Sequence, residues 1–240
     1  MIETYEDELI RERIEQIQGR IDKTAQRAGR NPAEIELIAV TKEKSAAVVK
    51  ALSENGITKI GESYLREALF KINILSDYKL EWHMIGNIQH GKEAQIALHF
   101  AQVHSVDRLQ IAETLNKKAI HFGRILPVYL EFNVSGEDTK HGWSAWKESQ
   151  WEQILPELDR VMDFPSLEIK GLMTMAPYSV NPEDARPIFK KLRKLGNYLS
   201  RNYPAANLNG LSMGMSGDFE TAIEEGATVL RIGSALVGPR

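Results

Sequence analysis

The feature that most constrains this chain is a repeated alternation between short apolar, β-branched runs and longer stretches with helical spacing. The first run is IELIAVT at 35–41, and such a nearly unbroken apolar run is typical of a strand buried on both faces. Seven more runs follow, at 58–63, 81–86, 102–107, 126–135, 168–175, 208–215 and 228–233. Strands that alternate with helices pair in parallel, and eight such units in 240 residues favour a closed barrel over an open sheet.

The stretches between these runs carry helix signals. In 45–56, apolar residues share one face behind Ser45, a candidate N-cap, and Gly56 suits the position just after a helix. Other helices are expected up to Ile74, Ile96 and Ile120, and over 145–162, 183–203 and 218–225. The first thirty or so residues also show helical spacing, ended by Gly29 and Pro32. We therefore predict an α/β fold, a single (β/α)8 TIM barrel with an extra N-terminal helix, as one domain over 1–240.

Composition and charge narrow the function classes. The net charge of −3 leaves no concentrated basic patch for nucleic acid or an anionic membrane. The absence of cysteine excludes disulfides, thiolate metal sites and cysteine nucleophiles, and the six histidines lack metal-ligand spacing. The acidic, amphipathic start lacks the features of a signal peptide, and no apolar run is long enough to span a membrane. We predict a cytoplasmic protein without a metal site.

In a (β/α)8 barrel the functional groups gather at the carboxyl ends of the strands. Lys42 directly follows the most apolar run, where partial desolvation would lower the pKa of its ammonium group toward a usable amine. A Schiff base with an aldehyde needs such an amine. A strand-terminal lysine that simply reaches solvent is the competing interpretation, and Lys44 and Lys140 belong to the same predicted mouth. Spacing alone does not choose among them.

The segments after the last two predicted strands favour a phosphate site, which this fold often places there. In SMGMSGD, Gly214 and Gly217 allow the backbone to approach an anion, and Ser216 offers a hydroxyl just before a helix. In RIGSALVG, Gly233 and Ser234 add amides and a second hydroxyl. Each motif alone is better explained as a turn glycine with an N-cap serine. Both motifs together, after the two expected strands, favour phosphate binding.

Two further polar residues fall within predicted strands. Arg231 lies between Leu230 and Ile232, and because an isolated buried charge is costly, it either points into the barrel mouth toward a partner or marks a misplaced strand. A ligand nitrogen is one candidate partner, and since arginine does not lose its proton, it would keep such a nitrogen unprotonated. His83 either lines the pocket or packs inside the barrel.

Several segments resemble the pyridoxal-phosphate homeostasis proteins of the YggS/PROSC type, and the resemblance covers nearly the whole chain. The matching segments are IAVTK at 38–42, IGESYLREA at 60–68, WHMIGNIQ at 82–89, FNVSGEDTKHG at 132–142, GLMTMAP at 171–177 and the highly specific LSMGMSGDFETAIEEGATVLRIGSALVG at 211–238. This family is similar in turn to the N-terminal barrel of bacterial alanine racemases and eukaryotic ornithine decarboxylases.

The resemblance implies a cofactor, pyridoxal 5′-phosphate (PLP), and assigns residues to it. Lys42 would form the Schiff base, Ser216 and the Gly233–Ser234 backbone would hold the phosphate, and Arg231 would face the pyridine nitrogen. The remaining predicted cofactor-binding residues are Ser63, His83 and Met213. The family usually has asparagine at Ser63 and glutamine at Arg66, so the contact at Ser63 departs from the pattern.

The same resemblance implies a monomeric carrier or regulator in PLP homeostasis that affects amino-acid and keto-acid balance, without catalytic residues and with PLP-dependent apoenzymes as recipients. The related racemases need a second, β-rich domain, for which this chain has no room. Two alternatives stay open. One is a weakly active single-domain PLP racemase, and the other is a barrel for another phosphorylated metabolite or flavin, with Lys42 as a counter-charge.

Overall fold

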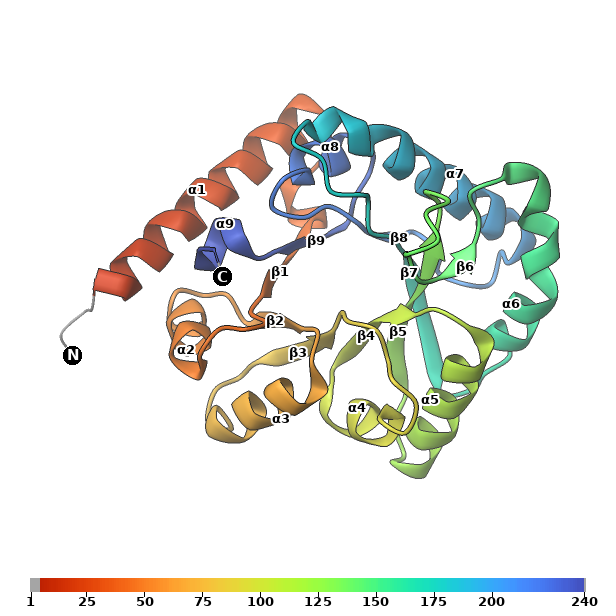
Figure 1. Cartoon of the computed structure of the whole chain (residues 1–240), viewed down its shortest axis with the longest axis horizontal. Helices are drawn as coiled ribbons and strands as arrows, with labels where there is room; N and C mark the ends of the chain where they lie inside the picture. Colours follow the sequence, from red (N-terminus) through yellow and green to blue (C-terminus); the bar gives the residue numbers. More distant parts are fainter. Residues whose placement is uncertain (1–4, 240) are drawn as a thin grey trace.

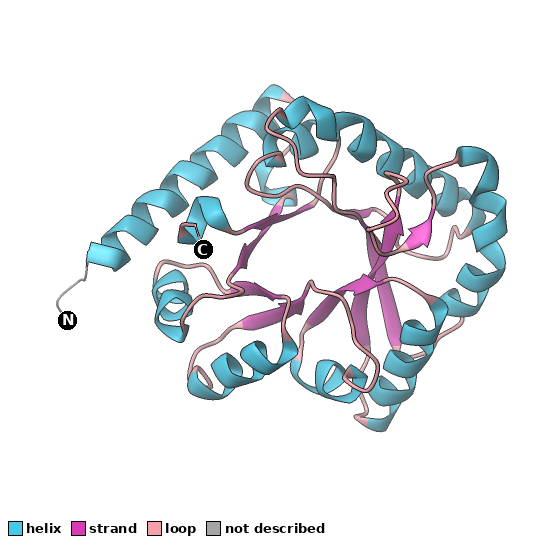
Figure 2. Ribbon diagram, viewed as in Figure 1, coloured by secondary structure: helices cyan, strands magenta, loops and turns pink. Residues whose placement is uncertain are grey.

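A computed structural model describes residues 5–239; residues 1–4 and 240, which the predicted 1–240 domain includes, lie outside the described residues. Eight parallel strands close into a barrel surrounded by helices (Figure 1), and Figure 2 shows the strands as the inner ring. The strands of the barrel are β1 (Glu36–Val40), β2 (Lys59–Glu62), β3 (Glu81–Met84), β4 (Gln102–Val106), β5 (Leu126–Asn133), β7 (Leu167–Met173), β8 (Gly210–Ser212) and β9 (Val229–Ile232). The predicted fold class is confirmed.

The barrel is closed by pairing between neighbouring strands all the way round the ring. The strand order is β4-β3-β2-β1-β9-β8-β7-β5, and pairing of β4 with β5 completes the ring. Every pairing is parallel, as expected when each strand is followed by a helix that returns the chain to the same end. All eight carboxyl ends therefore open on one face.

Helices cover the outside of the barrel. They are α1 (Tyr5–Arg27), α2 (Ala46–Glu54), α3 (Leu65–Ile74), α4 (Glu93–His99), α5 (Leu109–His121), α6 (Leu155–Met162), α7 (Arg186–Asn202), α8 (Phe219–Glu224) and α9 (Ser234–Val237), with 3-10 turns η1 (Pro32–Glu34), η2 (Glu148–Ile154) and η3 (Pro182–Ala185). The extra helix α1 lies along the outside against α2, α8 and α9 (Figure 1). No helix in the described part of the chain is long and apolar enough to cross a membrane.

Capping residues at both ends explain where helix α2, which follows β1, begins and ends. The Ser45 hydroxyl accepts a hydrogen bond from the Val48 amide, which satisfies one of the free N–H groups at the start of α2. Gly56, with φ of 85°, takes the left-handed conformation that ends the helix at low cost. Both predicted caps are confirmed.

The predicted helix over 145–162 is wrong in its first half. Residues 148–154 form the 3-10 turn η2, and α6 begins only at Leu155, with Pro156 in its first turn. Proline there lacks an N–H that the helix does not use and has a φ suited to a helix start, so the α-helix begins at this point. Just before η2, Trp143 and Ser144 form β6, a two-residue strand paired with the end of β5.

The apolar core has two parts. The larger one lies between the strands and the helices, and a small one, of Ile38, Tyr129, Met173 and Val229, lies inside the barrel. Above and beside this small apolar layer, the interior carries polar side chains. The barrel interior beneath the opening at the carboxyl ends of the strands is therefore lined by polar side chains.

Candidate functional site

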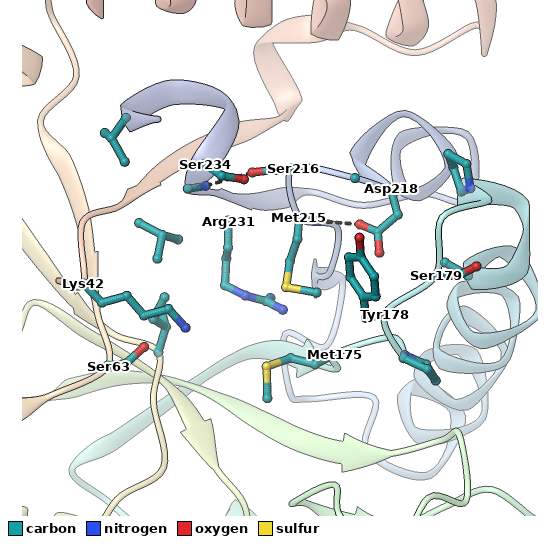
Figure 3. Close-up of a pocket in the computed structure, with 18 of the residues that line it drawn as sticks. Lys42, Ser63, Met175, Tyr178, Ser179, Met215, Ser216, Asp218, Arg231 and Ser234 are labelled. Atoms are coloured by element: carbon teal, nitrogen blue, oxygen red, sulfur yellow. Dashed lines mark hydrogen bonds between the residues drawn. The ribbon is translucent and has the colours of Figure 1, made fainter. Parts of the chain in front are cut away.

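A cavity of about 380 Å³ opens at the carboxyl ends of the strands, between β1, β9 and the loop after β7 (Figure 3). Ligand pockets in proteins begin at roughly this size, about 300 Å³. The cavity is lined by Val40, Lys42, Lys44, Ser63, Ile85, Met175, Pro177, Tyr178, Ser179, Asn181, Pro182, Ala185, Met215, Ser216, Gly217, Asp218, Arg231, Gly233, Ser234, Val237 and Gly238. Six of the eight predicted cofactor-binding residues line this cavity: Lys42, Ser63, Ser216, Arg231, Gly233 and Ser234.

Arg231 lies in β9 and points into the barrel, which resolves the two interpretations of its position. It is 3% exposed, and its guanidinium donates to the Ser212 hydroxyl at 2.6 Å and to the Thr174 carbonyl oxygen at 2.8 Å. Desolvation lowers the pKa of Arg231 to about 10, although Glu131 and Asp218 act in the opposite direction. The side chain stays cationic at neutral pH and brings a positive charge to the cavity floor.

Below Arg231 a chain of neutral polar groups runs through the barrel interior. The Ser212 hydroxyl lies 3.0 Å from Nδ1 of His104, and Nε2 of His104 lies 3.0 Å from Nδ1 of His83. Burial lowers the pKa of His83 to about 3 and that of His104 well below its ordinary value, the nearby cations adding to the effect. Both imidazoles are therefore neutral, and among the described residues the Arg231 guanidinium is hydrogen-bonded to neutral groups and not to a carboxylate.

Ser216 lies at the junction between the loop after β8 and the start of α9. Its hydroxyl oxygen accepts hydrogen bonds from the amides of Gly233 and Ala235, both at 3.2 Å. Figure 3 shows Ser216 and Ser234 side by side along one edge of the cavity. Two backbone N–H groups therefore meet the Ser216 hydroxyl at this edge of the cavity, and groups of this kind can bind phosphate oxygens.

Gly214 has a packing role that the sequence did not predict. Its φ is 95°, and a Cβ there would lie 2.6 Å from the Cβ of Ala222 in α8. Glycine is needed at this position for the left-handed backbone and for close packing against the helix. Gly217, by contrast, faces open space and lines the cavity.

Lys42 reaches into the cavity from the turn after β1, on the same side as Ser63 (Figure 3). Of its two predicted rivals, Lys44 also lines the cavity, but its ammonium donates to the Pro239 carbonyl oxygen at 2.6 Å. Lys140 is not part of the lining. The geometry therefore favours Lys42, whose side chain points into the cavity (Figure 3), over Lys44, whose ammonium lies against the C-terminal backbone.

The structure does not bring two of the predicted residues to the cavity. Met213 follows directly on Ser212, and since successive side chains of an extended strand point to opposite faces, it packs in the outer core while Ser212 points inward. His83 is 1% exposed and lies in the interior chain beneath Arg231. Neither residue is among those that line the cavity, so their predicted direct contact with a cofactor is not supported.

Several lining residues were not predicted. Met175 and Tyr178 come from the loop after β7, and Met215 and Asp218 flank Ser216 (Figure 3). The Asp218 carboxylate accepts from the Met215 amide at 2.6 Å, and burial raises the pKa of Asp218. The position of each just beyond a predicted strand was an available signal, because loops after the strands form this face of the barrel.

Glu131 adds an ionisable group to the barrel interior. It is 3% exposed on β5, and desolvation together with the charge of Asp107 raises its pKa to about 7, while Arg231 and Lys140 oppose this shift. A carboxyl group of this kind is half protonated near neutral pH.

Comparison with known proteins places this geometry in a class. Residues 13–240 match the family model described as "Alanine racemase, N-terminal domain", so the fold and site define a barrel of that class. Proteins named "Pyridoxal phosphate homeostasis protein" match nearly end to end: that of Pseudomonas aeruginosa is 43% identical, with 96% of each chain covered, and that of Aquifex aeolicus is 39% identical, with 95% of this chain and 97% of its own covered. The chain belongs to the pyridoxal phosphate homeostasis protein family.

A solved structure extends the comparison to three dimensions. PipY of Synechococcus elongatus PCC7942, determined with PLP bound, superposes with a TM-score of 0.82 at 30% identity. The match covers 95% of this chain and 100% of PipY. The similarity therefore extends over nearly the whole chain.

Proposed function

We propose that this chain binds PLP as a Schiff base on Lys42 and acts as a carrier or regulator in PLP homeostasis. The observation that carries the proposal is that Lys42, Arg231 and the amides around Ser216 all meet in one cavity. An aldehyde, a pyridine ring and a phosphate each have a chemically suited partner there. The names of the relatives and the PLP bound to PipY support the same function.

The residues present fit the groups of the cofactor. The Gly233 and Ala235 amides now donate to the Ser216 hydroxyl, and they form with it a cradle for phosphate oxygens. Arg231 would lie at the pyridine nitrogen and, because it keeps its own proton, would leave that nitrogen unprotonated. Ser63, where the family usually has asparagine, would offer a hydroxyl beside Lys42.

PLP supplies an aldehyde that reacts reversibly with amines. Lys42 would hold that aldehyde through its amine. Because this bond would be reversible, it would allow release of the cofactor to a recipient. We infer that the recipients are PLP-dependent apoenzymes, and that the protein acts in the cytoplasm as a monomer.

The arrangement supports binding rather than turnover. Racemisation needs a placed acid or base on each face of the bound amino acid, and an unprotonated pyridine nitrogen makes PLP a weak acceptor of electrons. Tyr178 lines the cavity opposite Lys42, but it is 93% exposed, so its phenol is not held at a fixed place. Weak racemisation of an amino acid is the alternative function, and assay of D- and L-alanine and serine tests it.

The test is the visible spectrum and intact mass of the protein incubated with PLP, before and after borohydride. Wild type is expected to show a reducible visible band and, after reduction, the mass of one pyridoxyl phosphate group. Lys42→Ala is expected to show neither. Lys44→Ala is the matched control, because Lys44 lines the same cavity, and it is expected to behave as wild type.

Three outcomes would contradict the proposal in different ways. An unchanged adduct in Lys42→Ala would move the Schiff base to another lysine. No band and no added mass in wild type, with phosphate esters still binding, would indicate a barrel for another phosphorylated metabolite. Sustained turnover of alanine or serine that Lys42→Ala abolishes would make the protein an enzyme.

A further inference from the structure

A buried lysine outside the cavity contacts the turn that carries Lys42. Lys71, in the middle of α3, is 2% exposed, although lysine is rarely buried unless it is paired. Its ammonium donates to Oε1 of Glu62 at 2.8 Å and to Oε1 of Glu67 at 2.6 Å. Its third hydrogen bond, at 2.7 Å, goes to the carbonyl oxygen of Thr41, the residue just before Lys42. All three protons of the ammonium are used.

The two carboxylates that pair with Lys71 contact the same turn. The Thr41 hydroxyl donates to Oε1 of Glu62 at 2.6 Å, and the Glu43 amide donates to Oε1 of Glu67 at 2.7 Å. The backbone is thus held at the residue before Lys42 and at the residue after it. Neither Lys71 nor the two carboxylates line the cavity.

The held conformation is one that the chain would not adopt readily by itself. Glu43 has φ of 63°, and it is the one non-glycine residue in the described part of the chain with a positive φ. Side chains with a Cβ are disfavoured in this left-handed region, so such a residue persists where the surrounding structure enforces it. The bond from the Glu43 amide to Glu67 provides that enforcement, and Lys71 holds Glu67 in place.

We propose that Lys71 is a positioning residue for Lys42. Through Thr41, Glu62 and Glu67 it fixes the turn in the geometry that directs the Lys42 amine into the cavity. This inference rests on the proposed function, because it assigns to Lys71 the task of presenting the amine to the aldehyde of PLP. Misplacement of a reacting group by about 1 Å can slow a reaction by about a hundredfold, so the effect on capture is expected to be large.

The experiment measures the rate of PLP capture by stopped-flow absorbance in Lys71→Met, Lys71→Arg and wild type. Capture by Lys71→Met is expected to be at least about tenfold slower, and Lys71→Arg, which keeps the charge and the donors, is expected to recover part of the rate. Binding of 4′-deoxypyridoxine 5′-phosphate, which lacks the aldehyde, is measured in parallel. Its affinity is expected to change less than about threefold, because it depends on the phosphate cradle and Arg231.

A matched control separates positioning from general stability. Lys59 pairs with Glu36 at 2.7 Å on the same two strands, β1 and β2, but at the opposite end of the barrel. Lys59→Met is expected to lower the unfolding temperature without slowing capture. Equal capture rates in Lys71→Met and wild type, or equal slowing in Lys59→Met, would overturn the inference.

A second variant covers the case in which Lys71→Met does not fold. Glu67 is 25% exposed on the side of α3, so Glu67→Ala removes the acceptor of the Glu43 amide at a tolerant site. Its capture of PLP is expected to be slower than that of wild type, and an unchanged rate would contradict the inference. Lys42→Ala is measured in parallel. If the PLP adduct persists in Lys42→Ala, the proposed function is overturned. If the adduct is lost in Lys42→Ala but Glu67→Ala captures PLP at the normal rate, only the role of Lys71 is overturned.

Discussion

The two sides of the cavity position their basic residues by opposite means. On the β1–β2 side, the turn carrying Lys42 is tied to an ammonium group and two carboxylates, with Lys71 at the centre. On the β7–β9 side, Arg231 is held by a carbonyl oxygen and by a hydroxyl backed by two neutral imidazoles. Removal of one member of a buried ion pair leaves an unpaired charge, whereas removal of a neutral partner leaves a smaller deficit. The lysine side should therefore be the more sensitive to substitution.

The largest expected loss of stability comes from removing Lys71, the ammonium group on the β1–β2 side. Lys71→Met leaves the buried Glu62 carboxylate without its ammonium partner and should lower the free energy of unfolding by about 3–5 kcal/mol, measured by urea denaturation. Desolvation already raises the pKa of Glu62 in the presence of Lys71. Replacing both residues, Lys71→Met with Glu62→Met, should recover much of the loss, and costs that simply add would contradict this account.

A pH titration of stability tests Glu131, the ionisable group on β5 in the barrel interior. Because burial raises the pKa of Glu131 to about 7, its contribution to stability is fully present below the pKa of the unfolded chain and is lost as the pH rises through about 7. Glu131→Gln removes this contribution, so wild type should lose up to about 3 kcal/mol more than the variant between pH 5 and pH 8.5. Parallel pH profiles of the two proteins would contradict the shift.

The smallest expected loss of stability comes from removing the Ser212 hydroxyl, a neutral hydrogen-bond partner of Arg231. Ser212→Ala leaves the guanidinium and His104 each without one partner and should cost about 1–3 kcal/mol in urea denaturation. Ser105→Ala is the matched control, since Ser105 is equally buried but donates to a neutral group, the Gly86 carbonyl oxygen, at 2.6 Å. It should cost about 1 kcal/mol. A larger loss in Ser105→Ala than in Ser212→Ala would reverse the assignment.

The parts of the fold that depend on local patterns were predictable. Each barrel strand shows as an apolar run, since a parallel strand is buried on both faces, and the Ser45 and Gly56 caps act within a few residues. The position of Arg231 and of the loops around Ser216 followed from the rule that barrel function gathers at the carboxyl ends of the strands. The motifs of a known family added the cofactor.

The parts that depend on contacts distant in the sequence were not predictable. Lys71 and Glu67 have the spacing of an ordinary surface pair on a helix, and only the approach of Thr41, thirty residues away, buries the ammonium. Met213 packs in the outer core because successive strand residues face opposite sides, and the sequence alone does not decide whether Ser212 or Met213 faces the interior. The short strand at Trp143 has too few residues to show any period.

The chain of groups beneath Arg231 has a directional consequence. Arginine only donates, so the Ser212 hydroxyl oxygen accepts from Arg231. The Ser212 hydroxyl then donates to Nδ1 of His104, and Nε2–H of His104 donates to Nδ1 of His83. In this order every bond dipole turns its negative end to the guanidinium. The last nitrogen, Nε2 of His83, then carries a proton and has no acceptor among the described residues. The charge of Arg231 is thus balanced by hydrogen-bond dipoles that cross the barrel from β9 to β3 and end in one N–H group without an acceptor among the described residues.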